Sequence, residues 1–120
     1  MEFTQQSANQ NTVISIGEST IALSHTQLKM PCFISSKRAE EVSISSLEQV
    51  TKETVFPLLS PDSLNLLIIG TGKHSIFLSP KQQVALSELG LGVECMSNIS
   101  ACNSFNLLLS DLRPVGLLIL

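Results

Sequence analysis

The sequence predicts one α/β domain whose N-terminal half is antiparallel and whose C-terminal half contains a strand–helix–strand crossover. The first observation is a pair of apolar segments, residues 64–69 and 115–120, which are typical of strands buried on both faces. The second is a capped helical segment at 80–89, which lies between the first of these strands and another at 92–96. Such a unit closes right-handed with parallel strands, so it builds half of an open sheet.

A chain of 120 residues, 43% hydrophobic and 14% charged, has enough apolar material for one core and too little length for two. We therefore expect a single domain over residues 13–120 after a flexible, polar N-terminus at 1–12. Aliphatic side chains must fill the core, because Trp and Tyr are absent and only 5 Phe are present.

The N-terminal half is predicted to be built from short antiparallel strands. β-Favouring segments at 13–16 and 21–23 flank a polar Gly-Glu-Ser turn, which indicates a β-hairpin. Two further strands are expected at 32–34 and 42–44. Between these two strands, the self-cancelling charges of residues 37–41 predict a solvated turn.

Three helices are predicted, each with a side chain that can cap its N-terminus. The first begins after Ser45 or Ser46, with a Glu or Gln three residues on to complete a capping box, and ends at Pro57. The second spans residues 80–89, where a serine cap, a proline at the first position and a following glycine favour a helix. The third begins near Asn98, turns one apolar face to the core and ends at an Arg-Pro pair.

Composition excludes several classes of function. A formal net charge of −3, without a basic cluster or stacking Trp and Tyr, argues against a nucleic-acid partner. The three cysteines form no Cys-x-x-Cys pair and no zinc-ligand group, so we expect buried free thiols and no metal. No segment reaches the roughly 20 apolar residues that cross a bilayer, and the start resembles neither a secretory signal nor a mitochondrial presequence. We expect a protein of the bacterial cytoplasm.

Gly70, Thr71 and Gly72 follow a buried strand, where glycine-rich backbone can approach a phosphate closely. A dinucleotide fingerprint would need a third glycine near Ser75, and a P-loop would need Ser or Thr in place of His74. We therefore expect no cofactor and interpret the loop as a structural turn, with ligand binding as the alternative.

Cys102, near the start of the third helix, can be interpreted as a nucleophile with His74 as its base, since loops after neighbouring parallel strands meet at one end of a sheet. The alternative is a packed thiol on the apolar face that contains Phe105. Carboxylates are scattered without a spacing that pairs two of them, so no catalytic residue is predicted and we expect no enzyme.

Polar residues of the third helix and its end have a structural and a functional interpretation. Arg113 can bond the last helix carbonyls, or it can present its guanidinium to an anionic ligand or a partner. The asparagines of the helix can cap it and bond nearby loops, or join such a surface. The candidate ligand or partner surface consists of Gly70, Thr71, Gly72, Asn98, Asn106 and Arg113.

The C-terminal half resembles one small family of single domains of unknown function. The resemblance rests on five segments in order: LLIIGTG at 66–72, FLSP at 77–80, VECM at 93–96, ACNSFNLL at 101–108 and DLRPV at 111–115. The family includes the mitochondrial complex I assembly factor, the adipogenesis-associated Mth-type domain protein and many bacterial members. It implies a three-layer α/β fold with a central mixed β-sheet, two main helices and an N-terminal antiparallel β-hairpin, and no established enzyme activity.

The chain departs from the usual pattern of this family at several positions. Asn98 stands where Thr is common, Asn103 where Arg is common and Asp111 where Glu is common, and no Trp follows the early strands. The matching segments are those assigned above to central strands and turns, so the resemblance bears on the fold more than on the function.

Two functions from different classes are compatible with the sequence. The first is a non-enzymatic protein-interaction module that assists assembly of a respiratory or membrane complex, with subunits of that complex as partners. It predicts an exposed apolar patch. The second is a small-ligand or anion-binding domain, enzymatic or not, that uses the Gly70–Gly72 loop and the start of the third helix. It predicts a concave pocket where that loop, the helix start near Asn98 and Arg113 meet. A homodimer is compatible with both.

Overall fold

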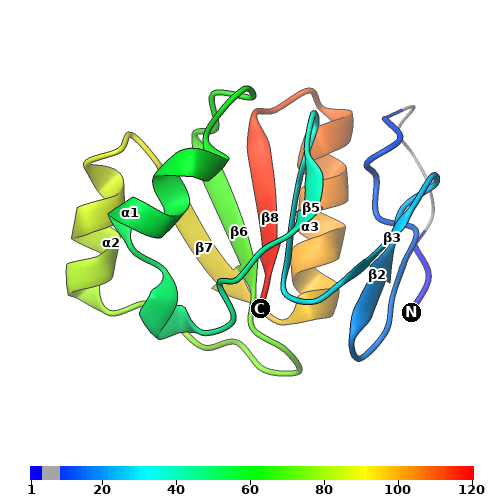
Figure 1. Cartoon of the computed structure of the whole chain (residues 1–120), viewed down its shortest axis with the longest axis horizontal. Coiled ribbons are helices and arrows are strands. Elements are labelled where there is room, and N and C mark those ends of the chain that lie inside the picture. The colour runs from blue at the N-terminus through cyan, green and yellow to red at the C-terminus, as the bar shows by residue number, and fades with distance from the viewer. Residues whose placement is uncertain (4–8) are drawn as a thin grey trace.

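The central layer of the molecule is a five-stranded mixed sheet, seen in a computed structural model that describes residues 1–3 and 9–120 (Figure 1). β6 is parallel to its neighbours β7 and β8, whereas β4 is antiparallel to β8 and β5. In spatial order the strands are β5 (Ala39–Glu41), β4 (Cys32–Ser35), β8 (Val115–Ile119), β6 (Leu66–Gly70) and β7 (Gly92–Met96).

Helices cover both faces of this sheet (Figure 1). One face carries α2 (Pro80–Ser87) and the short α1 (Lys52–Val55). The other carries α3 (Asn98–Ser110), with a small antiparallel sheet packed beside it. The predicted fold, three layers around a mixed sheet with two main helices, is confirmed. Within the described residues no helix is long and apolar enough to cross a membrane.

The small sheet contains the predicted hairpin and one strand that was not predicted. Its strands are β1 (Ser15–Ile16), β2 (Thr20–Ala22) and β3 (Gln27–Lys29), paired in that order. Of the three residues of β3, only Leu28 is buried. A single inward side chain gives no alternating pattern to recognise.

Alternation along the central strands divides the core in two. Ile68 and Leu117 point to the α3 side, where they pack in one cluster with Phe105. Leu67 and Leu118, one residue away in each strand, point to the opposite side and its separate cluster. Since β6, β8 and β4 need cover on both faces, neither helical layer is dispensable.

The first predicted helix is broken into three short pieces. A 3₁₀ turn at Leu47–Gln49 precedes α1, and a second one at Phe56–Leu58 follows it directly. Of the two predicted caps, Ser46 makes no capping bond, whereas the Ser45 N–H donates to the Gln49 side-chain oxygen at 2.7 Å. The capping box that starts α1 is instead formed by Thr51 and Thr54.

The charged segment predicted as a solvated turn is partly a strand. β5 pairs Ala39 with Ile34 of β4 and ends at Glu41, so the strand lies wholly before the predicted range 42–44, and that prediction is wrong. The cause is Arg38, whose guanidinium bonds Glu40 and the carbonyl of Ser60 and lies over the ring of Phe33, 5.5 Å from its centroid.

The predicted flexible N-terminus includes residues 4–8, which lie outside the described residues. On one side of this segment, the Phe3 N–H donates to the Ile14 carbonyl at 2.8 Å. On the other side Asn11 is buried, and its amide donates to the Ser35 carbonyl at 2.8 Å. The described flanks therefore pack against the domain.

Helix α3 ends in a Schellman motif with an unusual residue. The Arg113 N–H donates to the Leu108 carbonyl, and the Leu112 N–H donates to the Leu109 carbonyl. Leu112 has a φ of 57°, a conformation that favours glycine, and its side chain is 91% exposed. The backbone conformation is thus strained, and no burial of the side chain offsets it.

We predict that Leu112→Gly raises the free energy of unfolding by about 1 kcal/mol, because glycine adopts this conformation without steric cost. Leu112→Ala is the matched control. It removes the exposed side chain but keeps the Cβ, so it should change stability by less than about 0.5 kcal/mol. Urea denaturation of the three proteins measures both values. Equal stabilisation by the two variants would refute the backbone explanation.

Candidate functional site

The loop that follows β6 needs glycine at two positions for different reasons. A Cβ at Gly70 would lie 2.5 Å from the Asn98 Oδ1 and 2.5 Å from the Ile119 Cδ1, so only glycine allows the start of α3 to approach. At Gly72 nothing lies within 4 Å of such a Cβ, but the φ of 95° favours glycine. Close packing fixes the first position, and backbone conformation fixes the second.

Asn98 ties this loop to the first turn of α3. Its side-chain Oδ1 accepts a hydrogen bond from the Gly72 N–H at 2.9 Å, and its own backbone N–H donates to the Gly72 carbonyl at 2.7 Å. The Thr71 N–H donates to the Met96 carbonyl at 2.9 Å. The two amides that a phosphate would have needed are therefore already bonded within the protein.

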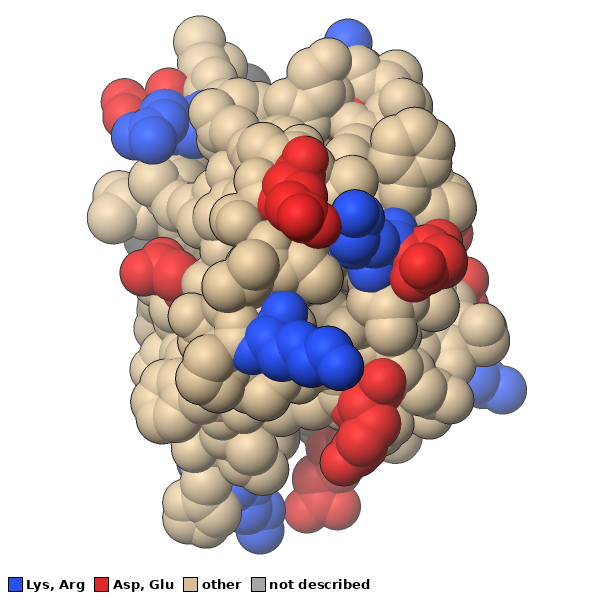
Figure 2. All heavy atoms as spheres, turned by 90° about the vertical axis from the view of Figure 1, so that its left-hand side faces the viewer, with Lys and Arg blue, Asp and Glu red and all other residues tan. Residues whose placement is uncertain are grey.

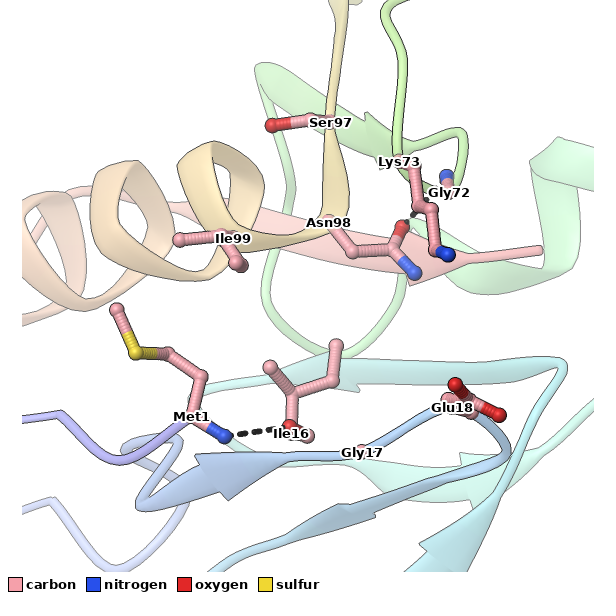
Figure 3. A pocket seen from close by; sticks show the side chains of 9 residues that line it. All are labelled: Met1, Ile16, Gly17, Glu18, Gly72, Lys73, Ser97, Asn98 and Ile99. Carbon is pink, nitrogen blue, oxygen red and sulfur yellow. Dashed lines mark hydrogen bonds between the residues drawn. The ribbon is translucent and has the colours of Figure 1, made fainter.

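A hollow of about 680 Å³ lies beside this pair of bonds, between the β1–β2 turn and the start of α3 (Figure 3). Its apolar side comes from Ile16 and Ile99, and charged groups of opposite sign come from Lys73 and Glu18. In Figure 3 the Lys73 and Asn98 side chains lie together on the side opposite the hairpin. The full lining is Met1, Ile16, Gly17, Glu18, Gly72, Lys73, Ser97, Asn98 and Ile99.

The predicted surface is split by the fold. Gly72 and Asn98 line the hollow together, as the sequence predicts for a ligand site. Asn106 is used elsewhere: its side chain accepts from the Val13 N–H at 2.9 Å and donates to the Val13 carbonyl at 3.0 Å. Through these two bonds, Asn106 holds the N-terminal segment to α3. Arg113 lies exposed beyond the opposite end of α3, outside the hollow.

The nucleophile interpretation of Cys102 is wrong. The thiol is fully buried in the cluster that contains Phe105, whereas His74 is exposed in the loop after Gly72. Burial raises the pKa of Cys102 to about 12, with a smaller contribution from Cys32. The thiol is therefore protonated and inert at neutral pH. No group of three metal-ligating side chains occurs in residues 1–3 and 9–120.

Sequence reasoning missed half of the hollow. The Ile16–Glu18 turn is recognisable as a hairpin, but no local signal places it against the start of α3. Lys73 directly follows the predicted glycine loop, but it is not among the predicted surface residues. The Ile16–Glu18 turn reaches the site because the small sheet packs on α3, which is a tertiary contact between distant segments.

Apolar side chains are exposed in the segment that joins β6 to α2. Phe77 is 71% exposed and Ile76 is 55% exposed, and Val84 on α2 is 63% exposed. The face formed by α1 and α2 carries scattered positive and negative side chains on a largely uncharged surface (Figure 2). No single-sign field covers this face, so apolar and mixed polar contacts are the interactions it offers.

The fold of this chain is similar to that of solved structures, one of which is described as a Mth938-like domain. A Bordetella pertussis protein described by that term superposes with a TM-score of 0.77 at 19% identity, covering 100% of this chain and 91% of that chain. A Bordetella parapertussis protein gives a TM-score of 0.81 at 22% identity, covering 94% of this chain and 97% of that one. These likenesses show the fold.

The chain belongs to the family described as protein of unknown function (DUF498/DUF598), whose model matches residues 13–120. It is also similar to the assembly factor 3 of the NADH dehydrogenase [ubiquinone] 1 alpha subcomplex. The mouse protein is 27% identical over 88 residues, 72% of this chain and 47% of its own length. The Xenopus tropicalis protein is 29% identical over 85 residues, 69% and 46% respectively. The chain thus spans about half the length of these relatives.

The double hydrogen bond of Asn106 gives a stability prediction. Asn106→Ala should lower the free energy of unfolding by about 1–3 kcal/mol, because it leaves the N–H and carbonyl of the buried Val13 without their partner. Asn103→Ala, on the exposed side of the same helix, should change it by less than about 0.5 kcal/mol. Chemical denaturation compares the two. Equal effects would mean that the side-chain bonds of Asn106 contribute nothing specific.

Proposed function

We propose that this domain is a non-enzymatic protein-interaction module that assists the assembly of a respiratory or membrane complex. The observation that carries the proposal is the similarity to complex I assembly factors, which extends over about seven-tenths of this chain. The shared part is the domain described above. We therefore assign the assembly-type role to the domain and infer that its partners are proteins.

Exposed apolar side chains support this proposal. Exposed apolar side chains that lie next to one another often mark a site of protein–protein interaction. Ile76 and Phe77 are adjacent in one connecting segment and both are more than half exposed, so they offer one anchor to a partner. Aromatic side chains that become buried when the partner binds are typical of the strongest contacts in protein interfaces.

The chemistry of the polar groups also supports a role without catalysis. The Cys102 thiol is buried with a raised pKa, and the loop amides of Thr71 and Gly72 are bonded internally. The Ser35 hydroxyl donates to Asp62 at 2.5 Å, but no histidine bonds either of these two residues. The Ser35 side chain is itself buried, so this hydroxyl does not face solvent. Among the described residues, no nucleophile is therefore paired with a histidine base.

The hollow beside Asn98 favours a second candidate function, the binding of a small anionic ligand. An apolar wall from Ile16 and Ile99 combined with the Lys73 ammonium suits a molecule with an apolar body and a carboxylate. The ligand carboxylate would lie on the Lys73 side of the hollow, away from Glu18 on the hairpin side (Figure 3). The volume of about 680 Å³ falls within the range of small-molecule sites. This candidate accounts for the predicted glycine loop without requiring a nucleotide.

The first proposal predicts that the wild-type protein, used as bait in cells of its own organism, enriches subunits of a membrane-bound complex. Phe77→Ser should reduce that enrichment about tenfold, because the variant removes an exposed anchor without opening the core. Leu107→Ser is the matched control, since Leu107 is 64% exposed on the opposite layer. Quantitative mass spectrometry gives the ratios. If no protein rises above an empty-bait control, the assembly role is rejected.

The second candidate predicts that octanoate raises the thermal unfolding midpoint by several degrees at a large excess over its dissociation constant. Lys73→Ala should reduce the shift strongly, because it removes one cation from the hollow, whereas the Met1 ammonium is held by the Ile16 carbonyl. Lys81→Ala on α2, outside the lining, should retain it. Inorganic phosphate tests whether the apolar body matters. A midpoint that octanoate leaves unchanged would reject this function.

A further inference from the structure

The two edges of the central sheet differ in whether a neighbouring strand and charged side chains block them. At one edge, β3 lies beside β5, and the Glu41 carboxylate accepts the Lys29 N–H at 3.0 Å. Arg38 and Glu40 form an ion pair at the same edge. Charges and a neighbouring strand thus block that side. At the other edge, no strand of the described residues pairs with the outer side of β7.

The hydrogen-bonding groups of β7 that face outward can be identified from its register. The Gly92 N–H donates to the Asn65 carbonyl, and the Met96 carbonyl accepts from Thr71, so both residues face β6. Backbone groups alternate in direction along a strand, so Glu94 also faces β6, whereas Val93 and Cys95 direct their N–H and carbonyl groups away from it. Two donors and two acceptors therefore line this edge.

A hollow of about 240 Å³ lies directly beside these groups. It is bounded by the exposed Phe77 and by the side chains of Val93 and Cys95, which point to the α2 side of the sheet. The remaining lining residues are Leu78, Gln83, Glu94 and Met96. A strand added to β7 would place alternate side chains in this hollow, and apolar ones match its walls.

Glu94 determines the charge of the preferred occupant. It is exposed and projects to the opposite side of the sheet from Val93 and Cys95, so every second residue of an added strand would lie near its carboxylate. A second copy pairing through both outward residues would set Glu94 against its own counterpart, which is unfavourable. Basic residues at those positions would be favourable. The charge thus selects another protein over a second copy.

We propose that the open edge of β7 binds an extended segment of a partner protein in which apolar and basic residues alternate. The apolar residues occupy the hollow beside Phe77, the basic residues lie near Glu94, and the backbone bonds Val93 and Cys95. This inference rests on the proposed role as a protein-interaction module and specifies its binding mode.

The test uses a synthetic peptide that alternates valine with lysine and is long enough to span β7. Its controls are a peptide with glutamate in place of lysine, and the lysine peptide N-methylated at the amides that would bond the strand. Binding to the isotope-labelled domain is followed by NMR, together with hydrogen exchange of the Val93 and Cys95 amides. We expect their exchange to slow at least about tenfold in the complex, as ladder hydrogen bonds form.

Two variants separate edge pairing from loss of fold. Glu94→Lys changes only an exposed charge and should weaken the lysine peptide about fivefold while making the glutamate peptide the better ligand. Val93→Pro removes one outward N–H and should abolish binding. The variant should still fold, because proline is tolerated at sheet edges when the missing donor faces solvent. Absence of saturable binding, equal binding of the N-methylated peptide, or unchanged exchange at Val93 and Cys95 would each overturn the proposal.

The same Glu94→Lys variant, used as bait in cells, separates this inference from the proposed function. Partners that are enriched by wild type and lost with the variant support both. Partners retained by the variant uphold the interaction role but overturn the β7 edge as its site. If no partner is enriched and the peptide still protects Val93 and Cys95, the edge binds extended segments and the assembly role is rejected.

Discussion

Burial of β8 on both faces is the constraint on which the rest of the structure depends. All five of its residues are buried, so each face of the sheet needs a covering layer. Gly116 makes one of these contacts possible, because a Cβ there would lie 2.8 Å from the Phe33 ring. Phe33 is one of two fully buried phenylalanines among the described residues, and Arg38 packs over its ring and bonds outward to Glu40. Because Gly116 has no side chain, Phe33 can pack against β8. Phe33 in turn supports Arg38, whose ion pair with Glu40 lies at the blocked edge of β5.

The candidate site follows from the same layering. Because α3 must cover one face, its first residue arrives at the end of β6, where Gly70 gives it room and Asn98 bonds Gly72. The small sheet covers the rest of this face. Asn106 of α3 bonds the backbone of Val13, which lies just before that sheet in the chain. The hollow lies between the β1–β2 turn and the start of α3, where the small sheet and the helix do not pack closely against each other. It forms because two separate elements, α3 and the small sheet, cover this face.

The parts predicted from the sequence are those whose signals are local. β6 and β8 are uniformly apolar, and α2 carries its own capping box and proline, so each is recognisable without knowledge of its neighbours. The position of β5 depends on bonds from Arg38 to a segment about 20 residues away, and β3 buries only Leu28. The wall of the hollow that comes from the hairpin is also a tertiary contact. Periodicity and capping contain no information on such contacts.

The segment between β6 and α2 contributes to both candidate surfaces. Lys73 lines the hollow beside Asn98, and Phe77 bounds the one beside β7. Thr71 stiffens the segment between them, since its hydroxyl donates to the His74 carbonyl at 2.6 Å and accepts from the Ile76 N–H at 3.1 Å. A molecule that rearranged this segment at either surface would alter its free energy at the other, and thermodynamic linkage makes such an effect reciprocal. The two proposed functions, protein binding and ligand binding, are therefore compatible in one chain, because they would use opposite ends of one hydrogen-bonded segment.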